Sequence, residues 1–337
     1  MVKLVLVANP GREHVGRFLF ESAQDLGYEA IIHDLTEAYS RPSLIERIRY
    51  RLLDRKPRFI KRYSASLVAL CIAEKPDFVL TTGCAPVLAV DILKLKELGI
   101  KVVNFSTDDP WNRSHRSTWF FESLKEYDVV FTPRRHCLKE FLDIGIPKAR
   151  YIAFGYHPSA HYVSPIEDVN SNFRCDVLFY GGADDDRATM FKKFIGSGLD
   201  VHLYGSYWHC YSEFKDFYKG MLEPEYIPVA VRHAKLTICI GRKSNRDWHA
   251  MRSYEAPAMG ACLLVEDTED HRSLYGDSPD MVSYFSSSED IVIRSKELIA
   301  DAEKRSRMRK NVLERVTGQF NTYKDRLESM VKMLSEK

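Results

Sequence analysis

The amino-acid sequence lacks several features that mark common protein classes. No apolar run approaches the roughly 18 residues that a bilayer-spanning helix needs. The opening MVKLVLVANPG has too short an apolar core for a signal peptide and runs directly into a turn, so we interpret it as a first buried strand. Low-complexity segments and short repeats are also missing. We therefore expect a globular protein of the cytoplasm.

The seven cysteines exclude two further classes of protein. They are odd in number, widely scattered and never spaced as CxxC, so the sequence predicts neither a disulfide framework nor a zinc site. This usage is typical of a reducing compartment and again favours the cytoplasm. The turn after the first strand lacks the fingerprint GxGxxG, which argues against a dehydrogenase.

What the sequence does contain is a regular alternation of strands and helices. The chain has 337 residues, of which 45% are hydrophobic and 28% charged, so two globular domains are expected. The alternation predicts an α/β protein of two doubly wound, Rossmann-like domains. An irregular stretch over about 155–172 is the predicted linker, which places the domains at 1–160 and 173–315. The predicted strands are Val2–Ala8, Glu29–His33, Phe78–Thr82, Lys101–Phe105, Asp128–Thr132, Tyr151–Phe154, Asp176–Tyr180, Asp200–Tyr204, Leu236–Ile240 and Cys262–Val265.

The stretch Met251–Asp267 is the most informative part of the chain. Its small residues and Gly260 predict a helix, a glycine stop and a buried strand. Arg252 and Glu255 are three residues apart and share a face of that helix. A carboxylate in this position can hold two sugar hydroxyls and an arginine can hold phosphate. The alternative is an ordinary surface salt bridge between the two residues.

Polar loops follow the predicted strands of the second half, at the sheet edge where ligands bind. Glycines there allow a ligand to approach the backbone closely, and basic side chains beside them can bind a diphosphate. The candidate binding residues are Gly181, Gly182, Arg187, Gly205, Arg242, Lys243, Arg252, Ser253, Tyr254 and Glu255.

Clustered acids and two histidines allow more than one interpretation. Asp108 and Asp109 either include a general base for a hydroxyl or form a turn before Pro110. Asp108-Asp109 and the run Asp184–Asp186 could also hold Mg²⁺ or Mn²⁺. For Asp184–Asp186 a helix N-cap is the better interpretation. His157 and His161 flank a proline, and we favour ordinary loop histidines over metal ligands.

Residues 41–63 differ in character from the rest of the chain. They contain nine Lys or Arg residues against only Glu46 and Asp54, together with an apolar stripe from Leu44 to Leu53. Such a segment either contacts an anionic membrane surface or a polyanionic partner, or is a solvated helix packed on its own domain. It offers too few interleaved aromatic residues to predict nucleic-acid binding.

Four motifs resemble those of a known family. SYEAPAMGA, DVLFYGGADDDR with the later VHLYG, STDDPW and NTYKDR are similar to the CgeB-like (spore-maturation type) glycosyltransferases, of group-1 type with the GT-B fold. The resemblance runs from about Phe78 to Arg326. It implies that the second domain holds a nucleotide-sugar donor and the first an acceptor. It also implies that an amphipathic C-terminal helix, residues 316–337 with a bend near Gly318, crosses back to the first domain.

The resemblance also implies roles for individual residues. Group-1 enzymes carry two acids with seven residues between them, as Asp247 and Glu255 stand here. Glu255 would bind the donor ribose and Asp247 would lie near the transferred sugar, although Glu is usual at that first position. Arg187 matches an arginine of the family that binds phosphate. GT-B enzymes generally offset the charge of the leaving diphosphate with side chains and helix dipoles, which implies that no metal and no other cofactor is used.

The expected function is therefore the transfer of a sugar from a nucleotide-diphosphate sugar to an acceptor hydroxyl. The candidate catalytic residues are Asp108, Asp109 and Asp247. The acceptor is a glycan, a lipid-linked glycan or a protein, and residues 41–63 would place the protein peripherally on the inner face of a membrane. The alternatives are a nucleotide-sugar epimerase of the same fold and a non-catalytic two-lobed binding protein. The sequence does not distinguish the sugar, the nucleotide or the acceptor, nor retention from inversion of configuration.

Overall fold

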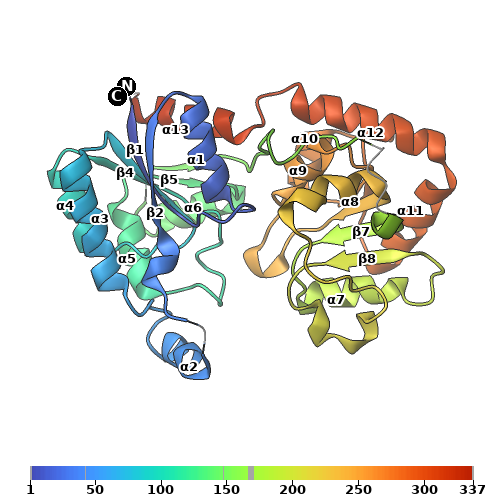
Figure 1. Ribbon diagram of the computed structural model, residues 1–337, viewed down its shortest axis with the longest axis horizontal. Coiled ribbons are helices and arrows are strands. Elements are labelled where there is room, and N and C mark those ends of the chain that lie inside the picture. The colour runs from blue at the N-terminus through green and yellow to red at the C-terminus, as the bar shows by residue number, and fades with distance from the viewer. Residues whose placement is uncertain (1, 42, 147, 166–170, 336–337) are drawn as a thin grey trace. The chain divides into compact units, whose positions relative to one another are not determined.

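The computed structural model describes residues 2–41, 43–146, 148–165 and 171–335. The chain divides into two compact units: unit 1 is Met1–Ala153 with Tyr323–Lys337, and unit 2 is Phe154–Thr322 (Figure 1). Each unit contains one parallel sheet and its own hydrophobic core. The predicted linker lies within unit 2, although residues 166–170 of it are outside the described residues.

The sheet of unit 1 has the strand order β2-β1-β3-β4-β5-β6, and all its pairs are parallel. Its central strands are continuous apolar runs that are buried on both faces, as expected when helices cover both sides. In Figure 1, α3, α4 and α5 lie on one side of the sheet and α1 lies with α13 on the other. The strands are β1 Lys3–Ala8, β2 Glu29–Asp34, β3 Phe78–Thr82, β4 Lys101–Phe105, β5 Val129–Thr132 and β6 Ala149–Tyr151. The helices are α1 Val15–Asp25, α2 Leu44–Leu52, α3 Ile60–Glu74, α4 Ala89–Glu97, α5 Thr118–Glu126, α6 Arg135–Asp143 and α13 Tyr323–Ser335, with a 3₁₀ turn at Leu35–Ala38.

The sheet of unit 2 has the order β11-β10-β9-β7-β8, again with parallel pairs. Its strands are β7 Cys175–Tyr180, β8 Val201–Tyr204, β9 Ala234–Cys239, β10 Leu263–Glu266 and β11 Ser283–Phe285. Its helices are α7 Asp185–Phe191, α8 Ile227–His233, α9 Arg252–Ala258, α10 Glu269–Tyr275, α11 Ser288–Ala300 and α12 Ala302–Thr317. Six 3₁₀ turns connect them, at Ser171–Phe173, Lys192–Phe194, Trp208–Cys210, Ser212–Phe214, Pro224–Tyr226 and Lys243–Asn245.

The helix, glycine stop and strand predicted from Met251–Asp267 are confirmed as α9, Gly260 with φ +76°, and β10. Pro257 lies inside α9 and has no N–H to donate to the carbonyl of Ser253. The hydroxyl of Tyr275 donates to that carbonyl instead. The side chain of a neighbouring helix therefore compensates for the proline and fixes α9 against α10.

Two of the predicted elements need correction. The strand expected at Tyr151–Phe154 lies at Ala149–Tyr151, because its register is set by pairing with β5, from Val130 opposite Ala149 to Thr132 opposite Tyr151. The single bent C-terminal helix is two helices, α12 and α13, and the chain between them forms a bridge from Thr322 to Tyr156. The return to the first domain is confirmed, but it begins at Tyr323, where α13 packs on α1 and the rings of Phe18 and Tyr323 stack at 5.5 Å.

None of the helices in the described part of the chain is long and apolar enough to cross a membrane. The basic segment forms α2 and the start of α3, and the sequence analysis did not predict that α3 continues to Glu74.

Candidate functional site

The loops that follow β7, β8 and β9 lie at one edge of the unit 2 sheet, because all these strands are parallel. Main-chain hydrogen bonds join the first two of these loops: Gly181 N donates to Tyr204 O at 2.8 Å, and Ala183 N to Ser206 O at 2.8 Å. The indole of Trp208 also donates to the carbonyl of Gly181, at 2.8 Å. The turn after β7 is therefore a fixed part of the fold.

The glycines of these loops make room for other parts of the protein. A Cβ atom at Gly205, where φ is +122°, would lie 2.6 Å from the carbonyl carbon of Gly181. A Cβ atom at Gly181, where φ is +153°, would overlap the guanidinium of Arg252. A Cβ atom at Gly241 would overlap the main-chain oxygen of Asp247, and one at Gly182 would lie 2.9 Å from Ser206 Oγ.

Arg252 places its guanidinium against this turn. The group lies over the ring of Tyr180 at 4.9 Å and within 5.5 Å of the ring of Phe179. Among the described residues Arg252 forms no ion pair, and its buried Nε has no hydrogen-bond partner. The surface salt bridge with Glu255 that the spacing allowed is therefore absent. A guanidinium held in place by aromatic rings, with its donors unused, is suited to bind an anion such as phosphate.

Glu255 lies one helical turn further along α9 and is 7% exposed. Burial, and then the Glu255 carboxylate, raise the pKa of Tyr180 well above its ordinary value, so the phenol stays protonated. His161 Nε2 lies 3.6 Å from Glu255 Oε1. Burial and the nearby His157 lower the pKa of His161 to about 3, so the imidazole beside Glu255 is neutral at physiological pH. A buried carboxylate in these surroundings is suited to accept hydrogen bonds from hydroxyl groups.

The sequence indicated His161 only as a loop histidine, and its position beside Glu255 was not predicted. Its Nδ1 accepts a hydrogen bond from His157 N at 2.9 Å, which turns Nε2 toward Glu255. His161 and Glu255 are nearly a hundred positions apart in the sequence, so no local sequence spacing could have predicted their contact. Neither His157 nor His161 belongs to a group of possible metal ligands among the described residues.

Arg187 is placed differently from the expectation of a phosphate ligand. It is 4% exposed, and its guanidinium donates to Gly182 O at 2.9 Å and to Ile240 O at 3.2 Å. Burial, followed by Arg252 and Arg242, lowers its pKa to about 10. Arg187 therefore links the loops after β7 and β9 and holds the Gly181-Gly182 turn in place.

Arg242 and Lys243 remain accessible beside the turn. Arg242 Nε lies 3.6 Å from Asp184 Oδ2, and Lys243 Nζ lies 3.8 Å from Asp186 Oδ1. The side chains of Arg242 and Lys243 are 40% and 58% exposed, so both can turn toward a bound anion. Asp184 is the N-cap of α7 and accepts from Arg187 N at 3.0 Å, which confirms the capping interpretation.

The remaining candidates from the same stretch have internal contacts. Ser253 is fully buried; its hydroxyl accepts from Ala250 N at 3.0 Å and lies 2.8 Å from His271 Nε2. Tyr254 is 5% exposed and its ring lies edge-on to that of His249. The side chains of Ser253 and Tyr254 therefore point into the interior of unit 2. Asp247 accepts a hydrogen bond from Arg242 N at 3.4 Å. Its negative charge acts to raise the pKa of Arg187, against the larger lowering by burial.

Asp108 and Asp109 follow β4 and belong to unit 1. Asp109 is fully buried and accepts from Trp111 N at 2.9 Å, as in the turn that was the alternative interpretation. Asp108 is partly exposed, and its carboxylate lies over Gly83, where a Cβ atom would come within 2.9 Å of Asp108 Oδ2. Of the two acids, Asp108 is thus the more accessible to a hydroxyl group.

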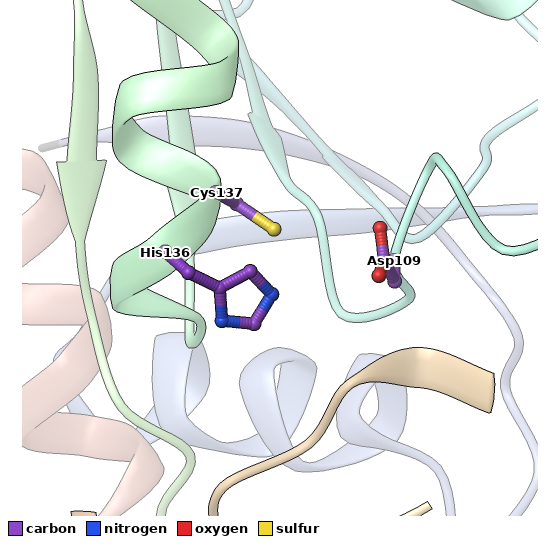
Figure 2. A group of neighbouring side chains, drawn as sticks. All are labelled: Asp109, His136 and Cys137. Atoms are coloured by element: carbon purple, nitrogen blue, oxygen red, sulfur yellow. The ribbon is translucent and has the colours of Figure 1, made fainter. Parts of the chain in front are cut away.

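Asp109 also takes part in the only possible metal-binding group found among the described residues (Figure 2). His136 and Cys137 lie on the first turn of α6 and face the loop of Asp109, with the three ligand atoms within 4.8 Å of one another. Carboxylate, imidazole and thiolate are ligands that suit Zn²⁺, with a fourth position left over. Asp109 belongs to one of the two acidic runs considered for a metal, whereas Asp184–Asp186 forms no such group among the described residues.

Part of the chain matches a known family model. Residues 187–332 match the family model described as glycosyl transferase-like. This stretch includes α9 and the loop of Arg242 and Lys243, and it covers less than half of the chain. No curated protein sequence matches the chain.

Solved structures resemble the whole chain. Anabaena HepE in complex with UDP has a TM-score of 0.68 at 11% identity, with 100% of both chains covered. Sucrose-phosphate synthase from Thermosynechococcus elongatus has a TM-score of 0.70 at 12% identity, covering 99% of this chain and 98% of that one. A protein from Listeria monocytogenes assigned as a UDP-N-acetylglucosamine 2-epimerase has a TM-score of 0.57 at 14% identity, covering 99% and 95%. At these identities the likeness shows the fold. The fold is GT-B.

Proposed function

We propose that the protein is a glycosyltransferase, of the CgeB-like type, that moves a sugar from a nucleotide-diphosphate sugar to an acceptor hydroxyl. The observation that carries the proposal is the position of Arg252, whose guanidinium lies against the Gly181 turn with no ion-pair partner among the described residues. Glu255 lies one helical turn away. Together they offer a cation for a diphosphate and a carboxylate for ribose hydroxyls. The match to the glycosyl transferase-like family model over residues 187–332 includes both residues.

In this proposal the donor is held by unit 2. Arg252, Arg242 and Lys243 offset the charge that develops on the leaving diphosphate, and Arg187 keeps the turn in place. Because three basic side chains are available for this, the proposal needs no metal and no cofactor beyond the nucleotide sugar. HepE has been solved with UDP and with UDP-glucose, which makes these two compounds the first ligands to try.

The acceptor in this proposal is a glycan, a lipid-linked glycan or a protein. We assign Asp108 of unit 1 as the general base for its hydroxyl, because Asp109 is buried and already bonded to Trp111 N. Asp247 is assigned to the transferred sugar. Residues 41–63, of which Pro42 lies outside the described residues, give the protein a peripheral contact with the inner face of a membrane.

The test is a thermal-shift screen of nucleoside diphosphates and nucleotide sugars, followed by a nucleotide-release assay. A ligand at about 100 times its dissociation constant raises the free energy of unfolding by ~2.7 kcal/mol, which is readily measured. We expect a shift with UDP or another nucleoside diphosphate, and release of that nucleotide only when an acceptor is present. Conversion of the donor without any second substrate would identify an epimerase instead. Binding without turnover of any kind would indicate a non-catalytic protein.

A further inference from the structure

Helix α2 has its apolar and polar faces reversed relative to a helix that packs on its own domain. Four of its apolar side chains are among the most exposed of the described residues: Leu44 at 73%, Ile45 at 76%, Ile48 at 50% and Leu52 at 78%. No residue of α2 is buried. Of its nine residues, only Glu46, Arg49 and Tyr50 are partly covered, and all three are polar or amphipathic. Helices on the surface of globular proteins normally show the opposite arrangement.

The helical geometry gathers the exposed apolar residues into one stripe. At about 100° per residue, Leu44, Ile48, Leu52 and Ile45 fall within an arc of about 100°. Arg47 and Arg51 border that arc on one side and Arg49 on the other. Glu46 and Tyr50 lie on the opposite face. Glu46 bonds Arg58 there and Tyr50 approaches the ring of Tyr39.

The segment that carries α2 is tied to unit 1 at its base, so the apolar stripe is held outward. Asp54 accepts from Thr118 N at 2.7 Å and from Trp119 N at 3.3 Å, at the start of α5. Phe59 N donates to Ala38 O at 2.9 Å, before the segment continues into α3. Figure 1 shows α2 standing apart from the other elements of unit 1.

Positive charge surrounds the same face. Residues 41–63 carry nine basic side chains against two acids, an excess of seven. Among the described residues, Arg41, Arg47, Arg51 and Lys61 form no salt bridge. Arg49, on one border of the stripe, pairs with Glu46 at 2.9 Å, whereas Arg47 and Arg51, on the other border, form no salt bridge with a described residue. An exposed apolar stripe with arginines along its borders matches a lipid surface with anionic headgroups. A polyanion such as nucleic acid would match the charge but would leave the leucines and isoleucines in water.

We propose that α2 lies in the headgroup region of an anionic lipid bilayer, with Leu44, Ile45, Ile48 and Leu52 among the acyl chains. The arginines at the border of the stripe contact the phosphates of the headgroups. This specifies the membrane contact of the proposed function as an insertion of apolar side chains, and it holds whichever reaction the protein catalyses.

The experiment measures co-sedimentation of the full-length protein with vesicles. The wild type is compared on vesicles of phosphatidylcholine alone and on vesicles that also contain phosphatidylglycerol, at low and high salt. We expect binding to the anionic vesicles only, weakened but not abolished by high salt, because exposed charges are screened and apolar contacts are not.

Two variants separate the contribution of the apolar side chains to vesicle binding from that of the arginines. Ile48→Ser with Leu52→Ser should weaken binding to anionic vesicles at least tenfold, because each buried side chain contributes more than a factor of ten. Arg47→Glu with Arg51→Glu should weaken binding at low salt to the level seen at high salt. The matched control is Ile72→Ser with Leu142→Ser, which removes two apolar side chains of unit 1 that are also exposed, at 56% and 60%.

Failure of wild-type protein to sediment with anionic vesicles would overturn the proposal. So would equal binding by the Ile48→Ser, Leu52→Ser variant and the control. The thermal shift with UDP is measured on every variant, and we expect it to be unchanged because donor binding belongs to unit 2. Loss of vesicle binding with an intact nucleotide shift therefore separates this proposal from the proposed function.

Discussion

The guanidinium of Arg252 occupies the space in which Gly181 has no side chain. The contact is so close that a Cβ atom at residue 181 would overlap Arg252 Nη2. It joins two segments more than seventy positions apart, the turn after β7 and the first residue of α9. The cation for the proposed diphosphate site therefore depends on a glycine in a different loop.

Replacing Gly181 by alanine should displace Arg252 and reduce nucleotide affinity. The φ of +153° is unfavourable for alanine, and the new methyl group would push the guanidinium off the ring of Tyr180. We expect the dissociation constant for UDP to rise at least tenfold, or about 1.4 kcal/mol, as measured by calorimetry.

The matched control for this change is Gly198→Ala in the same unit. Gly198 also has a positive φ, +80°, but a Cβ atom there would meet no atom within 4 Å. This variant should lose some stability and keep its nucleotide affinity. If both variants bind UDP like the wild type, Arg252 is not the phosphate ligand.

Replacing Glu255 by alanine should abolish the thermal shift that nucleotide produces. Hydrogen bonds to a charged group contribute about 1.5–3 kcal/mol each, so loss of a carboxylate that holds ribose hydroxyls should weaken binding roughly a hundredfold. Glu269→Ala, at an exposed position at the start of α10, is the control. An unchanged nucleotide affinity in the Glu255 variant would remove this residue from the site.

Turnover should survive excess EDTA, because Arg252, Arg242 and Lys243 are available to offset the charge of the diphosphate. The measurement is nucleotide release before and after chelation, with the metal content of the purified protein determined in parallel. Loss of activity that Zn²⁺ restores would point to Asp109, His136 and Cys137. In that case Cys137→Ser should abolish the restoration, whereas Cys210→Ser, at an exposed cysteine, should not.

Stability should fall as the pH is lowered below about 6.5. Burial lowers the pKa of His161 to about 3 and that of His271 to about 4, from an ordinary value of 6.5. The unfolded chain therefore takes up protons in this range that the folded protein excludes. The stabilisation is complete above pH 6.5 and is lost progressively toward pH 4 and below. At about pH 5 each of the two histidines lowers the free energy of unfolding by roughly 2 kcal/mol relative to its value above pH 6.5.

Urea denaturation at several pH values measures this effect. His271→Gln should reduce the slope of unfolding free energy against pH, while His209→Gln, at an exposed position, should leave it unchanged. The slope is the informative quantity, because the glutamine variant also alters the contact with Ser253. Equal slopes in all three proteins would contradict the assignment to buried histidines.

Much of the fold could be predicted because its signals are local. The buried parallel strands are short apolar runs, as in Phe78–Thr82 and Lys101–Phe105, which the structure reproduces at the same bounds. The glycine stop predicted at Gly260 has a positive φ, as a helix terminus requires. The strand β6 at the edge of its sheet is less apolar, and its predicted position, Tyr151–Phe154, was wrong by two to three residues.

The site could be predicted only in part, because its contacts join distant segments. Sequence spacing placed Arg252 and Glu255 on one helix, but not the fit of Arg252 against Gly181 or the approach of His161 to Glu255. Nor could it show that Arg187 points inward to two carbonyl groups. A side chain that binds a ligand and one that binds the backbone look alike in a sequence.

The return of α13 to unit 1 has a consequence for synthesis on the ribosome. Unit 2 is one uninterrupted segment, Phe154–Thr322, so all its residues are synthesised before α13. Unit 1 is begun first yet lacks the ring of Tyr323 that stacks on Phe18 until the final residues are added. Unit 2 can therefore complete its folding before unit 1 does. In unit 1 an apolar surface of α1 remains uncovered until α13 has been synthesised.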